Sequence, residues 1–157
     1  MRVLCVSAPL PGHLDWGGYL ATAAELAHRG HTVCWASGRA VQEQVAGLAF
    51  EPLAETGWRW PPPPPLPHDP NADPQAVRRQ RQLRALDQWL EPARVAAATQ
   101  ELAAVIDAFR PDLILSEMFI AAAGLAAEQA RAPLVVMGWP APAPRSADAN
   151  PGDEMVQ

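Results

Sequence analysis

Short apolar runs alternate with stretches of helical periodicity along most of the chain. Residues 3–6 and 32–36 are two such runs, and between them Tyr19, Ala23 and Ala27 recur on one helical face. Apolar runs of this length, without alternating polar residues, are typical of strands buried on both faces of a parallel sheet. The pattern predicts a strand, a helix and a second strand, joined by a right-handed crossover.

The same rhythm returns in the second half of the chain. Residues 113–115 and 134–137 are apolar runs, and an alanine-rich helical segment over residues 121–130 separates them. A helical stripe precedes the first run and contains Val95, Thr99, Leu102, Ile106 and Phe109. Strands alternating with helices predict an α/β protein with a Rossmann-like, doubly wound parallel sheet in three α/β/α layers.

The middle of the chain has a different composition. Residues 57–74 contain Trp58, Trp60 and an unbroken run of prolines over residues 61–65. Proline cannot donate a main-chain hydrogen bond, so this segment is expected to be an extended surface loop rather than part of a sheet. A short third strand is expected before it, over residues 48–53.

A long helix is predicted after the proline-rich loop. Asp73 followed by Pro74 is typical of a helix N-cap and first helical position. The helix should continue to about residue 90 and be broken at Pro92. Its three leucines, Leu83, Leu86 and Leu90, are expected to point toward the core.

Composition and charge exclude several classes of protein. Hydrophobic residues make up 49% of the chain, enough for a core, and the net charge of −5 is unsuited to binding a nucleic-acid backbone. Cys5 and Cys34 lie in apolar runs, which predicts buried free thiols rather than a disulfide framework. The N-terminal apolar run over residues 3–6 is too short for a signal-peptide core, and the longest apolar run, over residues 118–127, is too short to span a bilayer, so a cytoplasmic location is expected.

Polar side chains with catalytic potential follow two of the predicted strands. In a doubly wound sheet the strand order reverses between residues 3–6 and 113–115, and a crevice opens beyond the carboxyl ends of those strands. His13 and Glu117 follow these two strands. Histidine can act as a general base, and a carboxylate can fix its tautomer. A single histidine in a turn is also commonly a capping or solvated residue. Topology alone therefore leaves both a catalytic and a structural role open for His13.

The motifs PGHL at residues 11–14 and RPDLILSEMF at residues 110–119 lie in two segments that resemble the family 1 glycosyltransferases, which include UDP-glycosyltransferases and macrolide glycosyltransferases of the GT-B fold. The first comprises PGHL at residues 11–14 and RGHTV at residues 29–33. The second comprises RPDLILSEMF at residues 110–119, followed by Ala132 and Pro133. The two matches occur in the right order and at the right separation, while the proline-rich middle matches nothing specific.

The resemblance implies catalytic roles for two residues. His13 falls on the family's base, which deprotonates the acceptor hydroxyl during inverting transfer. Glu117 falls on the acidic residue, usually Asp, that orients this base, and Asp15 is a competing partner. Such enzymes generally need no metal, and the four histidines do not have metal-ligand spacing: His13, His28, His31 and His68.

The resemblance also implies that residues 1–140 form the N-terminal half of a GT-B fold, which binds the acceptor, followed by an irregular tail over residues 141–157. The expected partner is a small, hydrophobic molecule that carries a hydroxyl group. Candidate acceptor-binding residues are Gly12, Asp15, Trp16, Gly17, Trp58, Trp60, Phe119 and Trp139. The tryptophans serve equally well as packing residues under loops.

In this family a second, C-terminal domain holds the nucleotide-sugar donor, a UDP- or dTDP-sugar. Nothing after residue 140 resembles that domain's motif. We therefore expect no cofactor on this chain alone, and no activity without a C-terminal half, supplied in the same polypeptide or as a separate chain. Two alternatives remain: a non-catalytic module that binds a ligand or partner, and a nucleotide-binding α/β protein such as a sugar-nucleotide epimerase.

Overall fold

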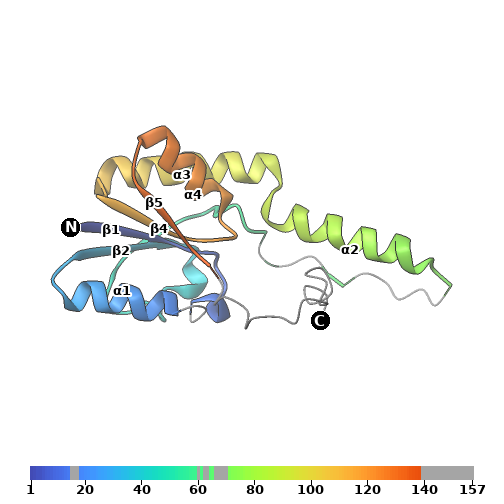
Figure 1. Cartoon of the computed structure of the whole chain (residues 1–157), viewed down its shortest axis with the longest axis horizontal. Helices are drawn as coiled ribbons and strands as arrows, with labels where there is room; N and C mark the ends of the chain where they lie inside the picture. The colour runs from blue at the N-terminus through green and yellow to red at the C-terminus, as the bar shows by residue number, and fades with distance from the viewer. Residues whose placement is uncertain (15–17, 60, 62–63, 66–70, 139–157) are drawn as a thin grey trace, which may run out of the picture.

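A computed structural model describes residues 1–14, 18–59, 61, 64–65 and 71–138. Within these residues the chain forms a parallel five-stranded sheet with helices on both faces (Figure 1). The strands are β1 (Arg2–Val6), β2 (Thr32–Ser37), β3 (Ala49–Pro52), β4 (Leu113–Glu117) and β5 (Leu134–Met137), in the order β3-β2-β1-β4-β5. The helices are α1 (Tyr19–His28), α2 (Pro74–Trp89), α3 (Pro92–Phe109) and α4 (Ala121–Ala130), with 3-10 turns η1 (Pro11–His13) and η3 (Arg39–Val41). The predicted three-layer, doubly wound architecture is confirmed.

The sheet is buried on both faces, which explains the continuous apolar runs. Leu4 and Val6 of β1 pack against α3 and α4, while Val3 and Cys5 pack against the side covered by α1. Successive strand residues point to opposite faces, so every residue of a central strand meets a helix layer. Cys5 and Cys34 belong to different faces and are both free thiols, as predicted.

The carboxyl ends of β1 and β4 lie side by side and are bound together by one side chain. Val6 pairs with Ser116 in the parallel register. Tyr19, in the first turn of α1, is only 2% exposed, and its hydroxyl lies 2.7 Å from both Val6 N and the carbonyl oxygen of Leu115. The hydroxyl accepts from the amide and donates to a carbonyl, so it ties the start of α1 to the ends of both strands.

The ends of α2 agree with the sequence signals. Asp73 Oδ1 accepts a hydrogen bond from Gln75 N at 3.1 Å, as an N-cap should. The helix ends at Trp89, and Pro92 opens α3 instead of continuing α2. Proline is well suited to the first turn of a helix, where its missing amide hydrogen would be unpaired in any case.

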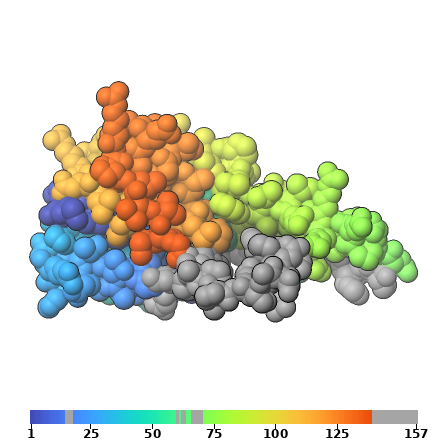
Figure 2. All heavy atoms as spheres, in the orientation of Figure 1, coloured from blue at the N-terminus to red at the C-terminus, as the bar shows by residue number. Residues whose placement is uncertain are grey.

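The predicted orientation of α2 is wrong. Leu83, Leu86 and Leu90 are 53%, 46% and 41% exposed, and no residue of α2 is buried. The green helix extends beyond the sheet and stands out from the body of the molecule (Figures 1 and 2). Arg84 of α2 donates a hydrogen bond to the carbonyl of Pro64. Periodicity identified the leucine stripe correctly, but no core lies beside it.

Replacing Tyr19 by Phe should destabilise the fold. The ring is kept, but a buried amide and a buried carbonyl at the ends of β1 and β4 lose their partner. We expect the free energy of unfolding to fall by about 1–3 kcal/mol, measured by urea denaturation. A loss below about 0.5 kcal/mol, within the range of ordinary surface substitutions, would contradict the role given to this hydroxyl.

The fold should lose stability as the solution becomes alkaline. Burial raises the pKa of Cys5 to about 12 and that of Cys34 to about 11, and it raises the pKa of Tyr19 well above its usual value. The unfolded thiols release their protons near their ordinary pKa of 9.0, while the folded state still holds them. The stabilisation is therefore fully present below pH 9.0 and is lost as the pH rises towards the pKa values of the thiols in the folded state.

Urea denaturation at a series of pH values from about 8 to about 11 measures this decline. The variant Cys5→Ala should show a shallower decline than the parent, because one of the titrating groups is gone. An unfolding free energy that stays constant over this range would show that the buried thiols and phenol do not keep their protons.

Candidate active site

Two segments with ionisable side chains meet at the carboxyl edge of the sheet. The chain leaving β1 passes through Ser7 and Ala8 into η1, whose last residue is His13. Glu117 is the last residue of β4. Because β1 and β4 are direct neighbours in the sheet, the two segments lie together at the switch point predicted from topology.

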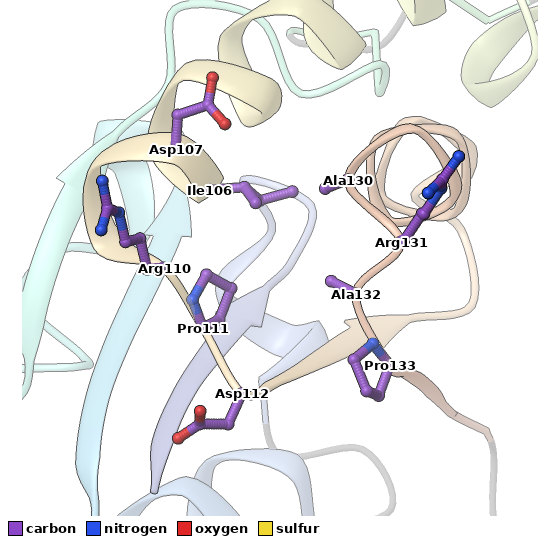
Figure 3. Close-up of a pocket in the computed structure, with 9 residues that line it drawn as sticks. All are labelled: Ile106, Asp107, Arg110, Pro111, Asp112, Ala130, Arg131, Ala132 and Pro133. Carbon is purple, nitrogen blue, oxygen red and sulfur yellow. The ribbon is translucent and has the colours of Figure 1, made fainter.

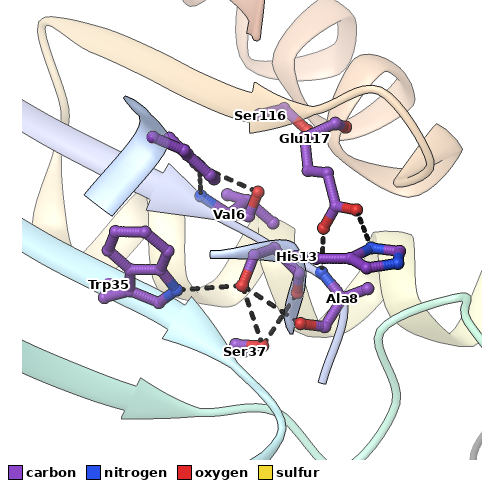
Figure 4. A network of polar contacts seen from close by, with 9 residues as sticks. Val6, Ala8, His13, Trp35, Ser37, Ser116 and Glu117 are labelled. Atoms are coloured by element: carbon purple, nitrogen blue, oxygen red, sulfur yellow. Dashed lines mark hydrogen bonds and ion pairs between the residues drawn. The ribbon is translucent and has the colours of Figure 1, made fainter. Parts of the chain in front are cut away.

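The carboxylate of Glu117 contacts both segments (Figure 4). Its Oε1 forms a hydrogen bond with Nδ1 of His13, and its Oε2 accepts from Ala8 N at 2.8 Å. The side chains of His13 and Glu117 are 12% and 7% exposed, so the pair is mostly shielded from water. An ionised carboxylate can only accept, so Nδ1 of a neutral ring carries the proton and the lone pair is on Nε2. This is the tautomer that a general base requires.

The extra methylene of Glu117, compared with the usual Asp, does not prevent contact with His13. One carboxylate oxygen holds the imidazole while the other is fixed by the main chain of the segment after β1. The acid is therefore bound from two sides. Asp15, the competing partner, lies outside the described residues.

Aromatic rings from two segments contact the ring of His13, and a third ring packs against one of them. The rings of Trp58, after β3, and of Phe119, after β4, each have their centroid 5.6 Å from that of His13. Trp58 and Phe119 also contact each other edge to face at 5.4 Å. Trp89, the last residue of α2, packs against Phe119 at the same distance. Trp89 was not among the predicted site residues.

The loop that carries Trp58 is held by carboxylates. Glu101 of α3 accepts hydrogen bonds from the amides of Ala54 and Glu55, at 2.7 and 3.2 Å. The side chain of Glu55 then accepts from two further loop amides, including that of Gly57, and from Arg94 at 3.1 Å. The contacts made by Glu101 and Arg94 join residues 39 to 47 positions apart, so no local sequence pattern could have revealed them.

Gly57 has a left-handed backbone conformation at the point where this loop contacts α3 and α4. Its φ is +84°, in the region that favours glycine, and a Cβ at this position would lie 3.7 Å from the methyl group of Ala98 and 3.8 Å from that of Ala122. The backbone just before Trp58 is therefore fixed against the two helices, and the indole starts from a well-defined position.

The remaining predicted acceptor residues have different outcomes. Gly12 is exposed in η1, directly before His13, and a Cβ there would meet nothing within 4 Å. Together with Trp58 and Phe119 it lies at the site, and binding of an acceptor by these residues stays a prediction. Five others lie outside the described part of the chain: Asp15, Trp16, Gly17, Trp60 and Trp139.

The described residues include neither a cluster of metal ligands nor a membrane-spanning helix. They contain no group of three or more His, Cys, Asp or Glu side chains placed to hold a metal ion. None of the helices they form combines the length and the apolar character needed to cross a membrane.

An open pocket of about 490 Å³ lies at the opposite edge of the sheet, between the C-terminal ends of α3 and α4 (Figure 3). Arg110 and Arg131, which cap these helices, stand on opposite sides of it. Asp112, also in its lining, accepts a hydrogen bond from Arg2 N at 2.6 Å. The pocket lies at the N-terminal ends of β4 and β5. Ligands of open α/β sheets bind beyond the carboxyl ends of the strands, so we place the candidate site at His13.

Comparison with known proteins identifies the fold. No protein-family model matches the chain, and no curated protein sequence is similar to it. Among solved structures it is similar to the glycotransferase of kitacinnamycin, with 23% identity and a TM-score of 0.60 over 87% of this chain and 30% of that one. The spinosyn rhamnosyltransferase SpnG, complexed with thymidine diphosphate, has 21% identity and a TM-score of 0.61 over 88% and 35%.

A third similar structure is the glycosyltransferase SsfS6 of Streptomyces sp. SF2575, complexed with thymidine diphosphate. It has 19% identity and a TM-score of 0.59 over 88% of this chain and 38% of that one. The chain thus spans about a third of the length of these three glycosyltransferases. At these identities the likeness shows the fold. It confirms the predicted fold class, the Rossmann-like parallel sheet of GT-B glycosyltransferases.

Proposed function

We propose that this chain is the acceptor-binding part of an inverting glycosyltransferase with His13 as its general base. The observation that carries the proposal is the contact between His13 Nδ1 and Glu117 at the carboxyl ends of β1 and β4. It occurs in a chain whose fold neighbours are glycosyltransferases. Both the tautomer and the position of the ring suit removal of a proton from a hydroxyl group.

In the proposed reaction Nε2 of His13 takes the proton of the acceptor hydroxyl while its oxygen attacks the anomeric carbon of the sugar. The bond from that carbon to the diphosphate oxygen breaks, and its electron pair leaves with the nucleoside diphosphate. Attack from the opposite face inverts the configuration. Glu117 stabilises the imidazolium that forms, because its carboxylate is already hydrogen-bonded to Nδ1.

The acceptor is proposed to be a small, hydrophobic, hydroxylated molecule. The rings of Trp58 and Phe119 supply apolar surface beside the imidazole, and Gly12 leaves open space next to it. Asp15, Trp16, Gly17, Trp60 and Trp139 belong to the same proposal on sequence grounds.

The donor, a UDP- or dTDP-sugar, is proposed to bind to a second domain outside these 157 residues. Two of the similar structures contain thymidine diphosphate, and this chain covers only 38% and 35% of their chains. Transfer therefore requires this chain and such a domain together, in one polypeptide or two. Buried free thiols at Cys5 and Cys34 suit the reducing cytoplasm, where we place the reaction.

A non-catalytic binding module is the competing interpretation. Such a module has no need for a carboxylate that contacts the far nitrogen of a histidine. The contact between Glu117 and His13, with the same carboxylate also held by Ala8 N, favours the enzyme.

The variant His13→Ala tests the proposed base. The chain is joined to, or mixed with, a nucleotide-sugar-binding domain from a similar glycosyltransferase, and sugar transfer to hydroxylated acceptors is measured. Loss of the base should lower kcat by about 10²–10⁴-fold. The exposed His28, at the end of α1, provides a matched control as His28→Ala. Equal activity of His13→Ala and the parent would refute the mechanism.

The variant Glu117→Gln tests the orienting acid. A glutamine amide can donate to Nδ1 of His13 and favour the tautomer whose proton is on Nε2, so kcat should fall by about 10²–10⁴-fold with little change in stability. Nitrogen chemical shifts of His13 in the isolated chain report the tautomer directly. If Nε2 carries the lone pair in both variant and parent, Glu117 does not set the tautomer.

A further inference from the structure

The indole nitrogen of Trp58 is an unpaired donor beside the proposed base. Trp58 Nε1 is shielded from solvent and has no hydrogen-bond partner among the residues that the structure describes. Its ring meets the imidazole of His13 nearly perpendicularly, with an interplanar angle of 73°. An indole N–H can only donate, so an oxygen or nitrogen lone pair is the partner it lacks.

An unpaired buried donor is unfavourable, and most buried polar atoms in proteins have a hydrogen-bond partner. The backbone before Trp58 is fixed by Glu55, Glu101 and Gly57, as described above. These contacts fix the backbone of the loop that places the indole beside His13. A ligand oxygen that reached this nitrogen would gain a hydrogen bond and remove the penalty at the same time.

We propose that Trp58 Nε1 donates a hydrogen bond to a second oxygen of the acceptor, close to the hydroxyl that His13 deprotonates. The inference rests on the proposed function, because it places the reacting hydroxyl at Nε2 of His13. Two neighbouring rings then hold two oxygens of one molecule. Because Nε1 is shielded from solvent in this structure, the proposal requires a local rearrangement of the Trp58 side chain when the acceptor binds, while the backbone of its loop stays in place.

This arrangement defines the class of acceptor. The reacting hydroxyl is flanked by a carbonyl, ether or second hydroxyl oxygen on an adjacent or next-but-one carbon. An isolated alcohol of the same size leaves the indole unpaired and binds more weakly. The second contact also fixes which of several hydroxyl groups faces His13, so Trp58 sets regioselectivity as well as affinity.

The isolated chain and a matched pair of probes, 2-hydroxycyclohexanone and cyclohexanol, test the inference. Proton–nitrogen spectra follow the indole signals of the labelled chain, and Trp58→Phe assigns the signal of Trp58. The hydroxyketone should shift this indole proton to lower field and bind about tenfold more tightly than cyclohexanol. Trp58→Phe should abolish the preference. Trp89→Phe, the same change at a tryptophan whose ring packs on Phe119, should retain it.

The outcomes separate this inference from the proposed function. If the signals of His13 shift with both probes while the indole of Trp58 does not, the acceptor site stands and the inference is overturned. If neither residue responds, both fail. If Trp58 responds with the expected preference but His13→Ala retains full transfer activity, the inference on binding stands and the proposed base fails. If Trp58→Phe folds poorly, through-space contacts between the Trp58 ring and the rings of His13 and Phe119 assign the indole signal, and the spectra of the parent chain then decide.

Discussion

The carboxylate of Glu117 is the contact on which the candidate site depends. It stands at the end of β4, holds the main chain that leaves β1 through Ala8 N, and holds the imidazole of His13 with its other oxygen. This requires β1 and β4 to be adjacent and parallel. The hydroxyl of Tyr19 stabilises this pairing through hydrogen bonds to the ends of both strands. The Glu117 side chain thus fixes the imidazole of His13 relative to the sheet.

The adjacency of His13 and Glu117 could be predicted from the sequence because it follows from strand order alone. Buried strands are visible as apolar runs, a doubly wound sheet reverses its order at a known point, and side chains that follow the two central strands must meet there. The N-cap at Asp73 and the break at Pro92 were equally predictable, since both are local rules of helix chemistry.

Other features could not be predicted, for a physical reason. Helical periodicity tells which residues share a face, and it correctly grouped Leu83, Leu86 and Leu90. It does not tell what that face meets, and here it meets solvent. The support of the Trp58 loop by Glu101 and the packing of Trp89 on Phe119 connect segments far apart along the chain. Such contacts depend on the positions of α2 and α3 relative to the sheet. A local pattern in a single sequence does not reveal these positions.

The protruding position of α2 divides the molecule into parts of unequal stability. The sheet and its covering helices share two cores, whereas α2 has no buried residue and few contacts with the body. Segments of this kind open at a small fraction of the global unfolding free energy and exchange their amide hydrogens early. Yet the last residue of α2, Trp89, rests on Phe119, which touches His13. Local melting of this outlying helix would therefore reach the imidazole through two aromatic contacts, so the order of the site is linked to a helix that has no buried residue.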